Sequence, residues 1–275
     1  KSFDFFPVSW RKPEKPGYLT PKPFRMPPQP IYSRLIDARS NGQKLLAVLI
    51  DPDRFRVRYL TELLEIAQTC AVDFFFVGGS LLVQDELEHC VQTIRQYSTT
   101  PVVLFPGNPL QINKTADAIL LLSLISGRNP EFLIGQHVVA APYLKASKLE
   151  IIPTGYALID GGKPTTVSYI SNTAPIPADK PEIAVCTAMA GEMLGLKMIY
   201  LDSGSGATNP VPASIIREVS HAVNLPLVVG GGLRTPEQVR QSLLAGADLA
   251  VVGGAIEKDP KILSVFSEAV KSFNR

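Results

Sequence analysis

Three segments of the chain place glycines directly after short apolar runs, and one of them also carries acidic and hydroxyl side chains. That segment is Tyr200-Leu-Asp-Ser-Gly-Ser-Gly-Ala207, and the other two span residues 227–234 and 249–255. Glycine lets the backbone approach an anion without a Cβ in the way. The freed N–H groups, together with a helix N-terminus, bind phosphate. We therefore predict a site for a phosphorylated ligand.

The competing interpretation of these glycines is that they only form tight turns. Two Gly-Gly runs at the ends of consecutive strands favour phosphate binding over that alternative. Strand alternation places Tyr200 and Asp202 on one face, where they could hold a polyol or accept a proton. Neither of two nucleotide motifs fits. The glycines do not match G-x-G-x-x-G, and the P-loop-like pair Gly162-Lys163 is followed by Pro164 in place of the required hydroxyl.

Asp51 and Ser80 form a second group of candidate ligands. Asp51 follows the apolar run at 45–50, and Ser80 follows the run at 74–77 after two glycines. If these runs are neighbouring parallel strands, the two side chains lie close together. Carboxylate and hydroxyl oxygens are hard ligands that suit Mg²⁺ bridging to phosphate oxygens. The alternative is that each side chain caps a following helix, with Asp85 a further candidate for the second cap.

The composition excludes several other classes of protein. A formal net charge of +2 over 275 residues is too balanced for a nucleic-acid surface. The three histidines share no ligand spacing, and the three cysteines are widely spaced, which favours a reducing cytoplasm as the location. The longest apolar run, at 118–125, is the length of a strand rather than of a membrane span.

Eight near-continuous apolar runs alternate with amphipathic stretches, which predicts parallel strands buried on both faces. Such alternation is typical of a (β/α)8 TIM barrel, with a doubly wound sheet as the second possibility. The interval between Phe105 and Ile119 is too short and too rich in turn residues for a crossover helix, so we predict that the third helix is missing. The predicted strands are 45–50, 74–77, 102–105, 119–124, 151–159, 198–201, 227–229 and 249–252, and the predicted helices are 57–69, 81–97, 130–147, 181–194, 212–223, 236–245 and 260–273.

The first part of the chain differs from the rest. Residues 1–30 are rich in proline and lysine, and proline blocks helix formation, so this part is expected to be a peripheral arm without an independent fold. Residues 31–275 are expected to form one catalytic barrel domain.

Taken together, these motifs resemble the geranylgeranylglyceryl phosphate synthase family, which includes bacterial heptaprenylglyceryl phosphate synthases. The resemblance covers roughly residues 31–275, and the motifs occur in the family's order at the ends of strands. They are Leu49-Ile-Asp-Pro-Asp53, Phe76-Val-Gly-Gly-Ser80, Tyr200–Ala207, Val229-Gly-Gly-Gly-Leu233 and Val252-Gly-Gly-Ala255.

The resemblance implies a modified TIM barrel whose third helix is replaced by a loop. It also implies an ether-forming transfer of a prenyl group from geranylgeranyl diphosphate, or a longer donor, to sn-glycerol 1-phosphate. Mg²⁺ would be bound by Asp51 and Ser80. The prenyl chain would lie along a groove leaving by the gap in the wall, with Phe74, Phe76, Leu104 and Phe105 as possible contacts. The residues implied in glycerol phosphate binding are Tyr200, Leu201, Asp202, Ser203, Gly204, Ser205, Gly206, Gly231, Gly232, Gly253 and Gly254.

In the reaction that the resemblance implies, Asp202 deprotonates the C3 hydroxyl of glycerol phosphate with help from Tyr200. The family usually has Glu at this position, so the carboxylate of Asp202 reaches about 1.5 Å less far and could act through water. The family also forms dimers and hexamers, so we expect a homo-oligomer. Release of a lipid product implies transient membrane contact without a transmembrane segment.

Two other functions remain open from the residues alone. A sugar-phosphate isomerase or aldolase could use the same barrel, but it needs a base or a Schiff-base lysine on a strand. Lys197 precedes its strand, at the wrong end for that role, and Lys145 and Lys148 belong to a predicted helix. A non-catalytic phosphate-binding barrel would have no need for Asp51, Tyr200 and Asp202 together.

Overall fold

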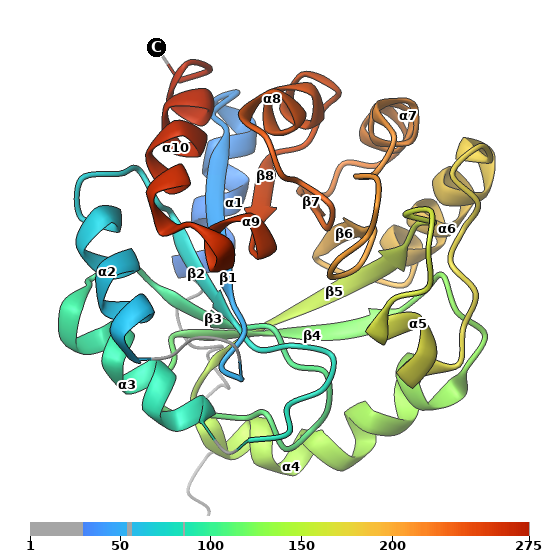
Figure 1. The fold of residues 1–275 in the computed structure, drawn as a ribbon. Helices are drawn as coiled ribbons and strands as arrows, with labels where there is room; N and C mark the ends of the chain where they lie inside the picture. The colour runs from blue at the N-terminus through green and yellow to red at the C-terminus, as the bar shows by residue number, and fades with distance from the viewer. Residues whose placement is uncertain (1–29, 54–56, 85, 275) are drawn as a thin grey trace, which may run out of the picture.

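The computed structural model describes residues 30–53, 57–84 and 86–274 (Figure 1). The predicted proline-rich arm lies outside the described residues except for Pro30, which is the first residue of a helix. None of the described helices is long and apolar enough to cross a membrane.

Eight parallel strands close into a barrel in which each strand pairs with its neighbours in the sequence and β8 pairs with β1. The predicted (β/α)8 barrel is therefore confirmed, and the doubly wound alternative is wrong. The strands are β1 Leu45–Ile50, β2 Phe74–Val77, β3 Val102–Leu104, β4 Ala118–Leu124, β5 Glu150–Leu158, β6 Met198–Asp202, β7 Leu227–Gly230 and β8 Leu249–Val252.

The strands are apolar along most of their length because both of their faces are covered. In β2, Phe74 and Phe76 belong to the cluster that fills the barrel, whereas Phe75 and Val77 belong to the cluster between the barrel and the helices. The same alternation places Tyr200 of β6 inside the barrel and Leu201 outside it. The barrel interior is therefore packed with side chains.

Helices surround the barrel as predicted, and most of their bounds agree with the sequence pattern within a few residues (Figure 1). The bounds are α2 Val57–Ala67, α3 Leu87–Tyr97, α4 Gln136–Ser147, α6 Pro181–Met193, α7 Ala213–Ala222, α8 Pro236–Leu244 and α10 Leu263–Lys271, with the short elements η1 Glu131–Gly135, α5 Thr166–Ser171, α9 Gly254–Lys258 and η2 Pro260–Ile262.

The capping interpretation of Ser80 is wrong. Helix α3 begins at Leu87, later than predicted, with Glu86 at its N-cap position, so Ser80 is too far away to cap it. The described part of helix α2 spans Val57–Ala67, and residues 54–56, which connect it to the segment of Asp51, lie outside the described residues, so capping by Asp51 stays a prediction. The other candidate cap, Asp85, lies outside the described residues.

Residues 105–117, between β3 and β4, form turns and no helix. This confirms the predicted loss of the third helix. The next helical segment, the π-helical turn η1 followed by α4, comes only after β4 and runs beside it in Figure 1. The barrel wall near β3 and β4 is therefore covered by a loop and by α4 instead of by a helix of its own.

Helix α1, Pro30–Ser40, was not among the predicted helices. It closes the end of the barrel where the strands begin, and it buries Ile31, Leu35 and Ala38 in the interior cluster. The backbone N–H groups of Ile31 and Tyr32 donate to the two carboxylate oxygens of Glu150, at 2.9 and 2.7 Å. Because this cap lies far away in the sequence, no local pattern marks the start of the helix.

Candidate active site

Asp202, the last residue of β6, is held at the carboxyl end of the barrel by two hydrogen bonds. Its Oδ2 accepts from the Tyr156 hydroxyl at 2.6 Å, and its Oδ1 accepts from the backbone N–H of Gly204 at 2.7 Å. The residue is 6% exposed. Burial raises the pKa of the Asp202 carboxyl, and the two hydrogen bonds oppose that rise. The carboxylate is thus fixed in position and has a higher proton affinity than an exposed aspartate.

Tyr156 was not identified from the sequence, yet it contacts Asp202 directly. The predicted partner, Tyr200, shares the barrel interior with Tyr156, and their ring centroids are 5.6 Å apart. The hydroxyl of Tyr200 points at Gly230, where a Cβ would come within 2.3 Å of it. Burial, with the Asp202 charge nearby, raises the pKa of both phenols well above the ordinary value. Both tyrosines therefore remain neutral hydrogen-bonding groups.

The glycines after β7 make room for neighbouring parts of the protein. Gly231, at φ +75°, faces Asp202, and a Cβ there would lie 2.2 Å from the carboxylate oxygen Oδ1. Gly232, at φ +68°, faces the loop after β6, and a Cβ would lie 2.6 Å from the carbonyl oxygen of Asn209. These positions need glycine for close packing and for a backbone conformation that L side chains rarely adopt.

The same strand ends present hydrogen-bond donors that no protein group uses. Within the described part of the chain, the backbone N–H groups of Ser205, Gly206, Gly231 and Gly232 donate to no other residue. The side chain of Ser203 is buried at 1% exposure, and its hydroxyl has no hydrogen-bond partner. Unsatisfied buried polar groups are rare in native proteins, so the Ser203 hydroxyl indicates a ligand. The four backbone N–H groups belong to exposed or half-buried residues, where a ligand can reach them.

Three further residues predicted to contact glycerol phosphate, Leu201, Gly253 and Gly254, lie in different surroundings. A Cβ on Gly254, the first residue of α9, would meet nothing within 4 Å, so the backbone there faces open space. A Cβ on Gly253 would come 3.2 Å from the Cβ of Leu49. Leu201 is fully buried in the outer cluster and points away from the barrel interior. The side chain of Leu201 is therefore excluded from the site.

Asp51 and Ser80 lie at the same end of the barrel, after β1 and β2. The carboxylate of Asp51 approaches the loop after β2, since a Cβ on Gly79 would lie 3.7 Å from both Cγ and Oδ2. Its Oδ1 accepts from the N–H of Asp53 at 3.1 Å. The described residues contain no group of three or more His, Cys, Asp or Glu side chains that could hold a metal ion. A carboxylate after β1 and a hydroxyl after β2 are donors of the type that suits Mg²⁺, which keeps waters and binds substrate phosphates.

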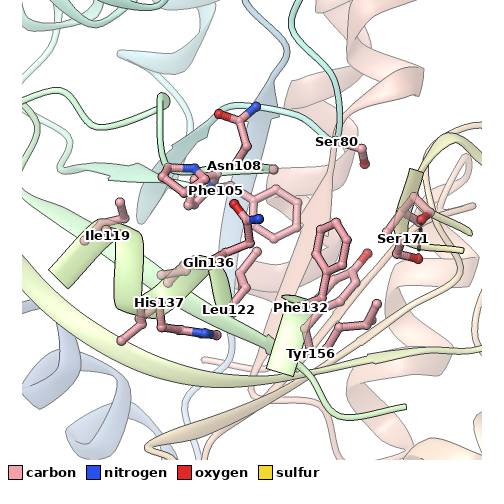
Figure 2. Close-up of a pocket in the computed structure, with 18 of the residues that line it drawn as sticks. Ser80, Phe105, Asn108, Ile119, Leu122, Phe132, Gln136, His137, Tyr156 and Ser171 are labelled. Atoms are coloured by element: carbon pink, nitrogen blue, oxygen red, sulfur yellow. Dashed lines mark hydrogen bonds between the residues drawn. The ribbon is translucent and has the colours of Figure 1, made fainter. Parts of the chain in front are cut away.

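An apolar pocket extends from the loop after β2 along β4 to α4 and α5 (Figure 2). Figure 2 shows the aromatic side chains of Phe105, Phe132 and Tyr156 close together in it, with Ser80 at one edge. The lining residues are Gly79, Ser80, Phe105–Pro109, Ile112, Ile119–Leu122, Leu124, Phe132, Gln136, His137, Ala140, Leu144, Tyr156, Val167, Ile170 and Ser171.

The walls of this pocket only partly match the predicted prenyl contacts. Phe105 lines the pocket, but Phe74, Phe76 and Leu104 do not, because they are buried in the core at 2% exposure or less. The largest part of the wall comes from β4, η1 and α4. Within it, His137 Nε2 lies 3.2 Å from the hydroxyl of Ser123, and burial lowers the pKa of this histidine.

None of the eight described strands carries the lysine that an aldolase-like mechanism would need. Lys197 lies at the opposite end of the barrel, and its ammonium group is 5.6 Å from the ring centroid of Tyr32 in α1. This position agrees with the sequence prediction and disfavours Schiff-base chemistry at a barrel strand.

Solved structures with this fold include close matches. The geranylgeranylglyceryl phosphate synthase from Thermoplasma acidophilum, in complex with its substrate sn-glycerol-1-phosphate, has a TM-score of 0.83 at 31% identity, covering 88% of this chain and 98% of that chain. The tryptophan synthase alpha subunit from Legionella pneumophila has a TM-score of 0.52 at 17% identity, covering 88% of this chain and 98% of its own, which shows the barrel fold alone.

Sequence comparison gives a narrower result. A geranylgeranylglyceryl phosphate synthase from Spirosoma linguale is 55% identical over 241 residues, which is 88% of this chain and 97% of that protein. One from Pyrococcus abyssi is 41% identical over 223 residues, covering 81% of this chain and 88% of that protein. The PcrB family profile matches residues 40–271. The chain belongs to the PcrB family.

Proposed function

We propose that this protein is a prenyltransferase that joins sn-glycerol 1-phosphate to a long-chain prenyl diphosphate, geranylgeranyl diphosphate in the first instance, through an ether bond. The observation that carries this proposal is the position of Tyr156. Its ring lines the apolar pocket, and its hydroxyl bonds to Asp202 beside the unused donors of the glycine loops. A site for a long apolar chain thus adjoins a site for a small phosphorylated polyol.

The relatives support the same substrates. The curated relatives from Spirosoma linguale and Pyrococcus abyssi are named for this synthesis, and the Thermoplasma acidophilum enzyme was crystallised with sn-glycerol-1-phosphate as its substrate. In this chain the glycerol phosphate would be bound by the backbone of Gly204–Gly206, Gly231, Gly232, Gly253 and Gly254 and by the Ser203 hydroxyl.

In the proposed reaction, the C3 oxygen of glycerol phosphate attacks C1 of the prenyl diphosphate. The new C–O bond forms as the bond from C1 to the diphosphate oxygen breaks, and diphosphate leaves. Asp202 accepts the proton of the C3 hydroxyl, and Tyr156 fixes the orientation of its carboxylate. The raised pKa of Asp202 increases its basicity for this step.

The rings near the reacting carbon are suited to developing positive charge. The ring of Phe105 stacks on Tyr200 at a centroid distance of 5.3 Å and meets Tyr156 edge-on at 6.0 Å. Aromatic faces attract cations, and an allylic carbon gains positive charge as its leaving group departs. This cluster would therefore stabilise the transition state at the junction of the apolar and polar sites.

Asp51 and Ser80 would bind Mg²⁺ together with the donor diphosphate. The bound ion would stabilise negative charge on the leaving diphosphate. Asp51 follows β1 directly and faces Gly79 of the loop after β2, whereas the Asp53 carboxylate accepts from the N–H groups of Val83 and Gln84.

Self-association and a cytoplasmic location belong to the same proposal. Ile183 and Met193 of α6, followed by Leu194, are exposed at 42%, 78% and 80%, which favours a homo-oligomer. The cysteines Cys70, Cys90 and Cys186 are free thiols, which suits a reducing compartment.

The test is a product assay with purified protein, Mg²⁺, radiolabelled sn-glycerol 1-phosphate and C15, C20 or C35 prenyl diphosphate in separate reactions. We expect an ether-linked lipid phosphate, with release of diphosphate, from at least one donor. sn-Glycerol 3-phosphate is the control for the acceptor. Folded protein that makes no product from any of the three donors would contradict the proposed function.

A further inference from the structure

The loop after β5 packs tightly on the loop after β6, which is the proposed glycerol phosphate loop. The carbonyl oxygen of Gly161 accepts from the N–H groups of Thr208 and Asn209 at 2.9 and 3.0 Å. A Cβ on Gly161 would come 2.5 Å from the Cβ of Ala207. Residues 160–165 therefore have a fixed position over the end of β6, although no sequence motif marked them as part of the site.

The side chain of Lys163 extends from the loop after β5 toward Gly206 in the loop after β6. A Cβ on Gly206 would lie 4.0 Å from the Lys163 ammonium nitrogen. Lys163 forms no ion pair with any carboxylate in the described part of the chain. The acidic residue of the same loop, Asp160, turns its Oδ1 to the N–H of Gly162 at 2.8 Å. Among the residues that the structure describes, no carboxylate therefore neutralises the positive charge of Lys163.

Lys163 and the buried hydroxyl of Ser203 line one pocket, together with Thr165 and Ser168. The Ser203 hydroxyl has no partner, and the N–H groups of Ser205 and Gly206 donate to no described residue. The Lys163 ammonium group and the Ser203 hydroxyl line this pocket, and the two backbone donors belong to the adjoining loop, where Gly206 lies next to Lys163. Donors of these kinds bind phosphate oxygens. Asp51 and Ser80 follow β1 and β2, away from this loop, so the donor diphosphate has its own ligands.

We propose that Lys163 is a substrate-binding residue that completes the phosphate site of the β6 loop and binds the phosphate group of the acceptor. This inference rests on the proposed function. It adds a cation to a site that otherwise contains only neutral donors. It also explains why the β5 loop is packed so closely against the β6 loop, because that packing fixes the Lys163 backbone at the edge of the site.

The experiment compares Lys163→Met, which removes the charge at similar length, with Lys163→Arg, which keeps it. Lys180→Met is the matched control, since Lys180 is an exposed lysine of the same β5–β6 connection and lines neither pocket. For each variant, KM is measured for both substrates, and the thermal shift produced by sn-glycerol 1-phosphate and by inorganic phosphate is recorded.

We expect Lys163→Met to raise KM for glycerol phosphate about tenfold or more, as is usual for a lost charge-assisted hydrogen bond. KM for the prenyl diphosphate and kcat should stay within about twofold, because the donor site is separate. Lys163→Arg should retain most of the affinity, and Lys180→Met should match the wild type. If Lys163 had only a structural role, Lys163→Met would lower thermal stability and would not raise KM for glycerol phosphate alone.

Unchanged KM for glycerol phosphate in Lys163→Met would overturn the inference, and so would a rise confined to KM for the donor. The thermal shifts separate this failure from failure of the proposed function. Suppose that the wild type makes no product but is stabilised by the phosphate ligands. Loss of that stabilisation in Lys163→Met would then support the phosphate site and contradict only the proposed activity. Equal stabilisation of both proteins rejects the site.

Discussion

At the scale of single residues, the site depends on the Asp202–Tyr156 pair. Burial raises the pKa of Asp202, and the hydrogen bond from Tyr156 partly offsets that rise because it stabilises the ionised carboxylate. A carboxylate in this balance accepts a proton more readily than an exposed aspartate does. The glycine at 231 belongs to the same arrangement, because its missing Cβ leaves room for the Asp202 carboxylate.

Asp202→Asn should lower turnover about 10²-fold or more, because an amide cannot accept the proton of the C3 hydroxyl. The substitution should leave the fold stable at neutral pH. An Asn side chain can still accept from Gly204 N–H and can donate to Tyr156, and it removes a buried charge. Steady-state kinetics and a thermal unfolding curve check both parts. Wild-type turnover in a well-folded variant would remove Asp202 from the role of base.

Tyr156→Phe should move the acid limb of the pH–rate profile to higher pH. The base works as a carboxylate, so activity falls as the pH falls through the pKa of Asp202, which burial already raises. The Tyr156 hydrogen bond lowers that pKa, and its loss raises the pKa further. The measurement is the pH dependence of kcat/KM for both proteins. An acid limb that stays in place, or moves to lower pH, would contradict this assignment.

Asp51→Asn should raise the Mg²⁺ concentration for half-maximal rate by about tenfold or more, since it removes the charged ligand. The reaction is followed during a Mg²⁺ titration at fixed substrate concentrations. Glu218→Gln, on the exposed surface of α7, is the control for a change of one charge. Asp51 would be excluded from the metal site if the Mg²⁺ midpoint did not change.

The residues that the sequence revealed are those whose neighbours along the chain form a pattern. Tyr200 through Gly206 stand in one segment, so their chemistry was visible together. Tyr156 was not visible, because its relation to Asp202 depends on the pairing of β5 with β6, in which Tyr156 lies opposite Tyr200. Lys163 was considered only as part of a nucleotide motif, and its place over Gly206 depends on the packing of two loops.

At the scale of elements, the bounds of the strands were predicted well, whereas helix α1 and the start of α3 were not. The apolar runs gave β1, β2 and β8 with correct bounds because both faces of each strand are buried. Helix α1 was missed because its N-terminal N–H groups are bound by Glu150, far away in the sequence. The start of α3 was placed too early, since residues 81–84 have helical composition but form no helix.

Glu150→Ala should lower the free energy of unfolding by about 1–3 kcal/mol. The buried carboxylate accepts from two N–H groups of α1, and its removal leaves them without partners in a covered site. Urea unfolding of both proteins measures the difference, and Glu218→Ala serves as an exposed control. If α1 docking did not depend on this cap, the two variants would unfold at the same urea concentration.

At the scale of the whole molecule, the missing third helix lets the apolar pocket pass beside β4 to α4. Alternation of strands and helices was sufficient to predict the barrel and this gap. It was not sufficient to predict the pocket, whose walls come from separate loops, β4, η1, α4 and α5 and therefore depend on packing.

Ala140→Phe should shorten the donor that the protein accepts. Ala140 is a buried residue of α4 in the pocket wall, and a ring there would fill space that a long chain needs. Product yields with C10, C15, C20 and C35 donors measure the effect, and we expect the longest donors to be lost first. Val139→Phe is the matched control, because Val139 is 58% exposed on the same helix and lies outside the pocket. Equal losses in the two variants would show that the pocket does not hold the prenyl chain.

The side of the barrel that lacks the third helix also affects how such an enzyme can change during evolution. The groups that would exchange protons and bind phosphate stand at the ends of β1, β2 and β5–β8, whereas much of the apolar wall belongs to β4 and α4. Substitutions on α4 can therefore alter the preferred lipid without disturbing the chemistry. A lineage that adopts a different membrane lipid could retain the reaction centre and vary one helix.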